Sequence, residues 1–125
     1  MFNTYNHNLT KMRLKIFVFL ENERKVWNIV SPRFEGIFTG TGDLFAGLFL
    51  SWYAKLGNSP ENLPNVMETV CATMEVVLKR TREDDIATRK FLKHPRKAPH
   101  ELQIIQSLDA ILRPPVSRSS SLIPQ

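Results

Sequence analysis

The sequence of 125 residues contains a single cysteine, Cys71, and this scarcity excludes several kinds of small protein. One cysteine cannot form an intramolecular disulfide, and it cannot supply a zinc site built from four thiolates. We expect Cys71 to be a small core residue rather than a reactive thiol. A lone thiol suits a reducing compartment, so we expect a cytoplasmic protein.

Long hydrophobic runs are missing as well. The longest strongly apolar run, Ile16 to Leu20, has five residues, whereas about 20 are needed to cross a bilayer. A secretory signal has a basic start and then an apolar stretch of about 7–15 residues. The first twenty residues are instead Asn-rich, then basic, then briefly apolar. We therefore expect neither a membrane span nor a secretory leader.

Positive charge is only mildly in excess. The chain has 17 Lys and Arg residues and 12 Asp and Glu residues, which gives a formal net charge of +5. The positive charges are spread along the chain, so a nucleic-acid-binding module is open as a hypothesis but not favoured. The histidines, His7, His94 and His100, are far apart and are expected at the surface. The apolar share of 42% and the charged share of 23% are those of an ordinary globular domain.

The first part of the chain predicts short strands that follow a loose arm over residues 1–14. Lys15 to Glu21 (KIFVFLE) and Val26 to Val30 (VWNIV) are typical of strands, and the polar break between them favours a hairpin. Pro32 should lie at a strand end, because proline cannot donate to a ladder. Phe34 to Thr39 predicts a third strand.

Apolar residues cover most of a helical wheel in the next stretch, Thr39 to Leu56 (TGTGDLFAGLFLSWYAKL). We expect a helix that is buried on most sides and packs inside a larger body. Gly57 should end this helix as a carboxyl-terminal cap, and Asn58-Ser59-Pro60 should turn the chain.

The remaining chain predicts a second helix and a docked closing segment. Apolar residues recur at helical spacing from Pro64 to Arg82. Glu83 to His100 lacks this rhythm and is expected to be a surface linker that includes at most one helical turn, whereas Glu101 to Leu112 should dock on the core. Residues 15–113 would then form the folded body, and residues 114–125, with Pro-Pro and a serine run, a disordered tail.

The residues with the clearest chemistry are Gly40, Thr41, Gly42 and Asp43, which stand between a predicted strand and a predicted helix. Backbone N–H groups at a helix start lack intrahelical partners, and glycine lets an anion approach them closely. The three residues from Gly40 to Gly42 could therefore hold a transferring phosphoryl group. Asp43 could take the proton from the attacking hydroxyl. The bland interpretation is a simple cap at a helix start.

The segment from Phe38 to Trp52 (FTGTGDLFAGLFLSW) resembles the signature near the carboxyl end of pyridoxal kinases, in the ribokinase-like superfamily. The resemblance extends over roughly Val26 to Pro114. It implies an α/β fold: a carboxyl-terminal fragment of a ribokinase-like fold, with short strands or a hairpin, two packed helices and a docked closing segment.

The resemblance also implies an activity, the ATP-dependent transfer of a phosphoryl group to the 5′-hydroxymethyl of pyridoxal, pyridoxine or pyridoxamine in vitamin B6 salvage. It implies Asp43 as the catalytic base, and Gly40, Thr41 and Gly42 as the anion hole on the ATP phosphates. It implies that the nucleotide site is lined by Ser31, Pro32, Arg33 and Phe34. Mg²⁺ is implied with ATP, but no ligand for it can be named in this sequence.

The resemblance is incomplete, because members of this family are more than twice as long and carry most of the substrate pocket in their amino-terminal half. We therefore expect a truncated kinase that is weak or inactive alone. A homodimer, or association with a full-length subunit, would supply missing surface. The alternative is a non-catalytic fragment that binds a partner through an exposed apolar helix surface.

Overall fold

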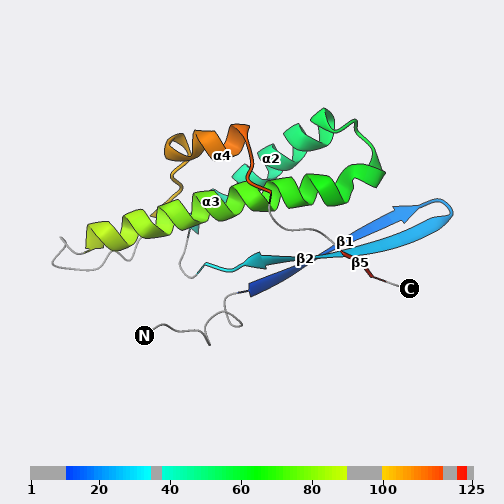
Figure 1. Cartoon of the computed structure of the whole chain (residues 1–125), viewed down its shortest axis with the longest axis horizontal. Coiled ribbons are helices and arrows are strands. Elements are labelled where there is room, and N and C mark those ends of the chain that lie inside the picture. The colour runs from blue at the N-terminus through cyan, green and yellow to red at the C-terminus, as the bar shows by residue number, and fades with distance from the viewer. Residues whose placement is uncertain (1–10, 35–37, 90–99, 117–120, 124–125) are drawn as a thin grey trace.

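The structure is a computed structural model of the chain, and it describes residues 11–34, 38–89, 100–116 and 121–123. The long helix α3 (Leu63–Arg89) runs through the middle. Figure 1 shows the hairpin on one side of α3 and two shorter helices, α2 and α4, on the other. The α/β arrangement of a hairpin, two packed helices and a docked closing segment is as the sequence predicts.

The hairpin consists of β1 (Lys11–Leu20) and β2 (Glu23–Pro32), joined by a turn at Glu21 and Asn22. The strands are antiparallel, with a register that runs from Lys11 opposite Pro32 to Leu20 opposite Glu23. The predicted hairpin and the position of Pro32 at a strand end are confirmed. The loose arm is wrong for residues 11–14, which belong to β1. Backbone pairing with β2 continues beyond the apolar run, because ladder hydrogen bonds do not require apolar side chains.

A short strand near the carboxyl end, β5 (Ser121–Ile123), pairs antiparallel with the other edge of β2. The prediction of a disordered tail is therefore wrong for these three residues. Their partner lies almost a hundred residues earlier in the chain, so local composition could not reveal the pairing. His7 and His94 lie outside the described residues.

The third predicted strand, Phe34 to Thr39, is shorter in the structure. β3 (Phe38–Thr39) pairs in parallel with β4 (His100–Glu101), with Phe38 opposite His100 and Thr39 opposite Glu101. Residues 35–37 lie outside the described part. The pairing brings the closing segment beside the strand that leads into the Gly-Thr-Gly-Asp turn.

The helices follow the predicted order with different bounds. α2 (Thr41–Lys55) ends at Lys55. Leu56 is its C-cap residue, and Gly57 follows with a left-handed φ of 99°, as expected of a glycine that terminates a helix. α3 continues seven residues past the predicted end at Arg82. The predicted linker is wrong for residues 83–89, because this charged stretch contains neither Gly nor Pro and nothing in it stops the helix.

The core has two adjoining parts along α3, and Phe45 and Phe49 of α2 pack against both. Ile29 of β2 packs with Met67 and Cys71, and Leu48 of α2 packs with Val66 and Val70. Cys71 is thus a buried core residue, as expected. The closing segment, with η2 (Ile105–Ser107) and α4 (Leu108–Leu112), docks on α3 through the buried Ser107 and Ala110.

Burial of α2 on most sides is not found within this chain. Leu48 is its buried residue, whereas the Leu50 side chain is 70% exposed. The apolar surface of α2 is thus only partly covered by α3. None of the helices in the described ranges is long and apolar enough to span a membrane.

Candidate functional site

The Gly-Thr-Gly-Asp turn connects β3 to α2. Gly40 follows β3 in the left-handed region, with φ 87° and ψ 11°, and is the N-cap residue of α2. The first helical hydrogen bond runs from the Leu44 N–H to the Gly40 carbonyl oxygen, at 3.0 Å. A left-handed N-cap without a side chain turns the strand into the helix and leaves the first-turn amides uncovered.

The backbone N–H groups of Thr41, Gly42 and Asp43 form the open end of α2. No side chain caps this end, and no acceptor for these three N–H groups is present in the part of the chain that the structure describes. Together with the helix dipole, these donors make a site of partial positive charge that suits an anion. We call the backbone of residues 40–43 the phosphate cradle.

The space at the glycines of the phosphate cradle is open. A Cβ atom built on Gly40 or on Gly42 would meet no atom within 4 Å. Both glycines are exposed, and Thr41 is half-buried. A phosphate can therefore approach the backbone without displacing any described residue.

Asp43 is exposed and lies in the first turn of α2. The interpretation of this residue as a simple cap does not hold, because Gly40 occupies the cap position and the helix start has no side-chain cap bond. An exposed carboxylate in the same turn as three unpaired amides can accept a proton beside a bound anion.

The residues predicted to line the nucleotide site divide into two pairs. Ser31 and Pro32 line an apolar cavity of about 160 Å³ that is completed by Phe45, Cys71, Met74, Glu75 and Leu78. Arg33 is exposed and Phe34 is half-buried, and neither lines this cavity. Ser31 is itself buried.

Phe45 of α2 lines the cavity and lies two residues after Asp43 in the sequence, whereas none of residues 40–43 lines it. The residues that sequence reasoning missed are those of α2 and α3, namely Phe45, Met74, Glu75 and Leu78. The helical spacing of Phe45, Met74 and Leu78 predicts core positions and gives no signal for a cavity, and nothing in the sequence singles out Glu75.

A cluster of ligands for Mg²⁺ is not found among the residues that the structure describes. They contain no group of three or more His, Cys, Asp or Glu side chains that could hold a metal ion. Asp43 alone does not make a site. The described residues therefore do not by themselves fit a protein-held metal.

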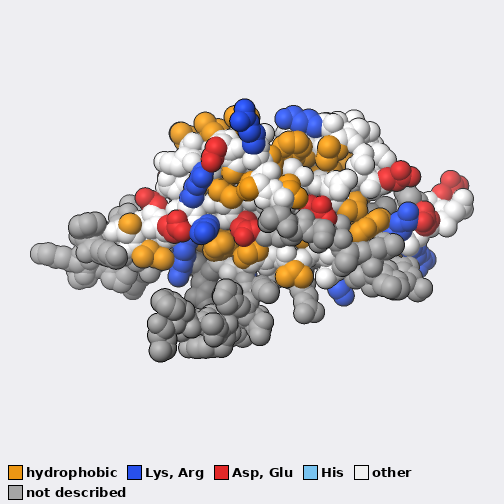
Figure 2. All heavy atoms as spheres, in the orientation of Figure 1, with side chains coloured by type: hydrophobic (Ala, Val, Ile, Leu, Met, Phe, Trp, Pro, Cys, Tyr) orange, Lys and Arg blue, Asp and Glu red, His pale blue; other side chains and the backbone are white. Residues whose placement is uncertain are grey.

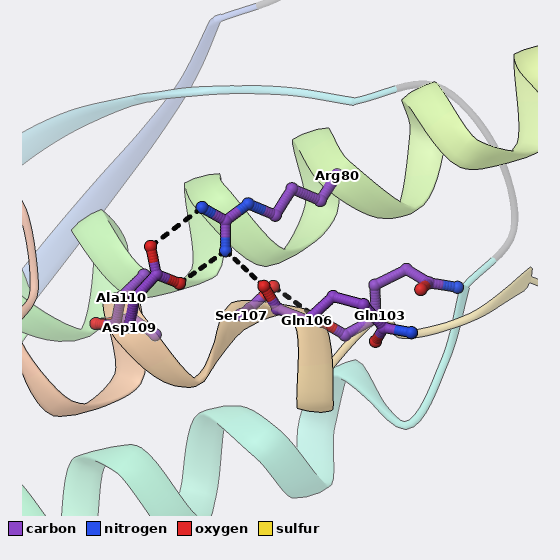
Figure 3. A network of polar contacts seen from close by, with 7 residues as sticks. Arg80, Gln103, Gln106, Ser107, Asp109 and Ala110 are labelled. Atoms are coloured by element: carbon purple, nitrogen blue, oxygen red, sulfur yellow. Dashed lines mark hydrogen bonds and ion pairs between the residues drawn. The ribbon is translucent and has the colours of Figure 1, made fainter.

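A network of polar contacts holds the closing segment on α3, as Figure 3 shows. Arg80 donates from Nη1 to Asp109 Oδ1 at 2.6 Å and from Nη2 to Oδ2 at 3.0 Å. The hydrogen bond from Arg80, followed by that from the Ala110 backbone, lowers the pKa of Asp109 to about 2. The same contact with Asp109 raises the pKa of Arg80.

Comparison with known proteins finds relatives that are similar to this chain over part of their length. No family model matches the sequence. The pyridoxal kinase of Arabidopsis thaliana is 32% identical over 90 residues, which are 72% of this chain and 27% of that protein. The pyridoxal kinase of Sus scrofa is 37% identical over 82 residues, which are 66% of this chain and 24% of that protein.

The chain is related to the pyridoxal kinases. The structure of the Leishmania donovani pyridoxal kinase in complex with ADP superposes with a TM-score of 0.68 at 20% identity, over 92% of this chain and 34% of that one. The Trypanosoma brucei pyridoxal kinase gives a TM-score of 0.53 at 27% identity. The predicted relationship and the ribokinase-like fold class are confirmed. The chain spans about a quarter of the length of the curated relatives it matches.

Proposed function

We propose that this chain supplies the phosphate cradle and the base of a pyridoxal-kinase-like, ATP-dependent phosphotransferase. The observation that carries the proposal is the first turn of α2, where three N–H groups and the Asp43 carboxylate share one open helix end. The relationship to pyridoxal kinases supports the choice of substrates, ATP and pyridoxal, with pyridoxine and pyridoxamine offering the same hydroxymethyl group.

In the proposed reaction, the 5′-hydroxymethyl oxygen of pyridoxal attacks the γ-phosphorus of ATP. Asp43 takes the hydroxyl proton as the new P–O bond forms. The bond from the γ-phosphorus to the bridging oxygen breaks, and ADP leaves with the electron pair. The amides of the phosphate cradle stabilise the charge on the transferring group. Such electrostatic stabilisation, together with positioning, accounts for most of the catalysis of phosphoryl transfer.

We propose that the nucleotide base occupies the apolar cavity that Ser31 and Pro32 line. Ser31 and Pro32 line one side of that cavity, and Met74 and Leu78 of α3 line the other. An apolar cavity with few polar groups suits a planar base, and Phe45 joins it to the helix that carries the cradle. Arg33 and Phe34 remain proposed contacts at the exposed rim. Mg²⁺ would bind together with the nucleotide. The proposed location of the protein is the cytoplasm.

The alternative function is a non-catalytic fragment that associates with a partner subunit, including a full-length kinase or a second copy. Exposed apolar side chains favour it. Leu50 is 70% exposed, and Ile105 of η2 is 78% exposed. Figure 2 shows hydrophobic side chains gathered on this side of the molecule, over α4 and beside α2. Contiguous exposed apolar surface is typical of interaction sites.

The test is ATP-dependent formation of pyridoxal 5′-phosphate by the purified chain, with Asp43→Asn as the paired variant. A positioned base contributes about 10²–10⁴-fold, so the variant should lose that factor. Wild-type activity no higher than that of Asp43→Asn would refute catalysis by this chain. Size-exclusion chromatography with a full-length subunit would then test the alternative, which predicts a shift to a larger species.

A further inference from the structure

The strand that leads into the phosphate cradle is held by strand pairing in the described part of the chain. β3 consists of Phe38 and Thr39, and the strand that pairs with it among the described residues is β4. Thr39 is opposite Glu101, and the next residue, Gly40, is the N-cap of α2. The placement of β4 therefore bears directly on the placement of the first cradle residue.

β4 is itself fastened to α3 by a buried threonine. The Gln103 N–H, two residues after β4, donates to Thr81 Oγ1 at 2.9 Å. Thr81 is buried, and its hydroxyl donates in turn to the Val77 carbonyl oxygen of α3 at 2.7 Å. A hydroxyl with one donated and one accepted hydrogen bond has a fixed orientation, so it defines where residue 103 lies relative to the helix.

Further hydrogen bonds hold the segment that follows residue 103. Ser107 Oγ donates to the Gln103 carbonyl oxygen at 2.6 Å, and Arg80 Nη1 donates to the Gln106 carbonyl oxygen at 2.6 Å. Figure 3 shows Arg80 reaching from α3 to this segment. The backbone around Gln103 is thus held from both sides.

We propose that Thr81, through Gln103, is a positioning residue for the phosphate cradle. The structure shows a chain of contacts from Thr81 to Gln103, from there to β4, and across the parallel pairing to Thr39 and Gly40. The inference rests on the proposed function of the cradle. It adds a residue on α3 that positions the cradle without touching the substrate. Loosening this series of contacts lowers the fraction of molecules in which the cradle is formed. The apparent affinity of the cradle for phosphate falls by that fraction.

The chain offers a matched control in Thr73. Its hydroxyl donates to the Ala110 carbonyl oxygen at 3.0 Å, so it also joins α3 to the closing segment from a buried position. This contact lies past Gln103 and on the far side of it from β4. Thr73→Val and Thr81→Val each remove one hydrogen bond between α3 and the closing segment, and Thr81→Val also removes the bond within α3 to Val77; only Thr81→Val loosens β4.

The experiment measures binding of inorganic tripolyphosphate to the full chain by the NMR shifts of the Gly40 and Gly42 amides. We expect Thr81→Val to weaken binding ~2–10-fold, the factor of one hydrogen bond, while Thr73→Val leaves it within error and Thr81→Ser restores it. A second readout needs no ligand. Hydrogen exchange of the Leu44 amide, which donates to Gly40, should speed up in Thr81→Val and stay unchanged in Thr73→Val.

Equal effects of Thr81→Val and Thr73→Val on binding and on Leu44 exchange would overturn the inference, since both would then act through stability alone. If Thr81→Val does not fold, Glu101→Pro breaks the β3–β4 pairing at an exposed position, with Glu101→Ala as its control. Glu101→Pro should then speed Leu44 exchange, and no change would refute the role of β4. Wild-type chain that binds no tripolyphosphate refutes the proposed function, whereas the exchange result still decides the positioning role.

Discussion

The substitution Gly42→Ala separates the stability of α2 from the use of its open end. Gly42 is the second helical residue of α2, and a Cβ there meets no atom within 4 Å. Alanine is favoured over glycine in a helix by about 0.5–1 kcal/mol, so the variant should be more stable than the wild type. For a chain of this size, that gain raises the melting temperature by about 2–5 °C.

The same methyl group should harm phosphate binding. Cα–Cβ bonds in a helix tilt toward the amino terminus, so the added carbon leans into the space where the anion would lie. We expect Gly42→Ala to weaken tripolyphosphate binding at least ~10-fold, equivalent to about 1.4 kcal/mol. Calorimetric melting and isothermal titration on the same sample measure both effects.

Gly47→Ala is the matched control, because Gly47 lies within α2 and its Cβ would also meet no atom within 4 Å. This variant should gain similar stability and keep its affinity. Unchanged phosphate affinity in Gly42→Ala would contradict the assignment of the cradle, whatever the change in stability.

The remaining predictions concern the core, the ion pair and the exposed surface. Ile29→Ala removes a fully buried side chain and should lower the free energy of unfolding by about 2–5 kcal/mol in urea titration, whereas the exposed Leu50→Ala should change it by less than about 0.5 kcal/mol. Because the pKa of Asp109 is lowered to about 2, its ion pair with Arg80 stabilises the fold above the unfolded pKa near 4. That contribution is lost as the pH falls through 2, so Asp109→Asn should show a flatter decline of stability over this window in acid titration followed by circular dichroism. The double variant Leu50→Gln and Ile105→Gln should shift sedimentation velocity toward monomer, and unaltered self-association would show that this surface is not the contact.

The elements with a strong local pattern could be predicted from the sequence. The hairpin strands, α2 and the start of α3 follow from β-branched and aromatic runs and from helical spacing. Gly57 ends α2 in the left-handed conformation because glycine alone adopts it without steric cost. The candidate site at Gly40–Asp43 was also visible, because its chemistry needs only adjacent residues at a strand-to-helix boundary.

The ends of several elements could not be predicted, because long-range pairing sets them. β5 forms on the edge of β2, and residues 11–14 extend β1 along the same ladder. The end of α3 past Arg82 carries charged residues whose lack of apolar rhythm resembles a linker, although nothing in them breaks a helix. Local composition holds no information about the strand pairing, whereas the absence of Gly and Pro from residues 83–89 is a local signal that α3 continues.

The sequence by itself determined that a glycine-flanked helix start with an adjacent carboxylate exists in this protein, since four consecutive residues suffice to specify it. Only the tertiary structure decided what surrounds that helix start. The cavity between Ser31 and Met74, the parallel pairing of Thr39 with Glu101 and the fastening of Gln103 to Thr81 each join residues more than twenty positions apart. Contacts at such separation depend on how the whole chain packs, because closing each loop costs entropy that only the assembled core offsets.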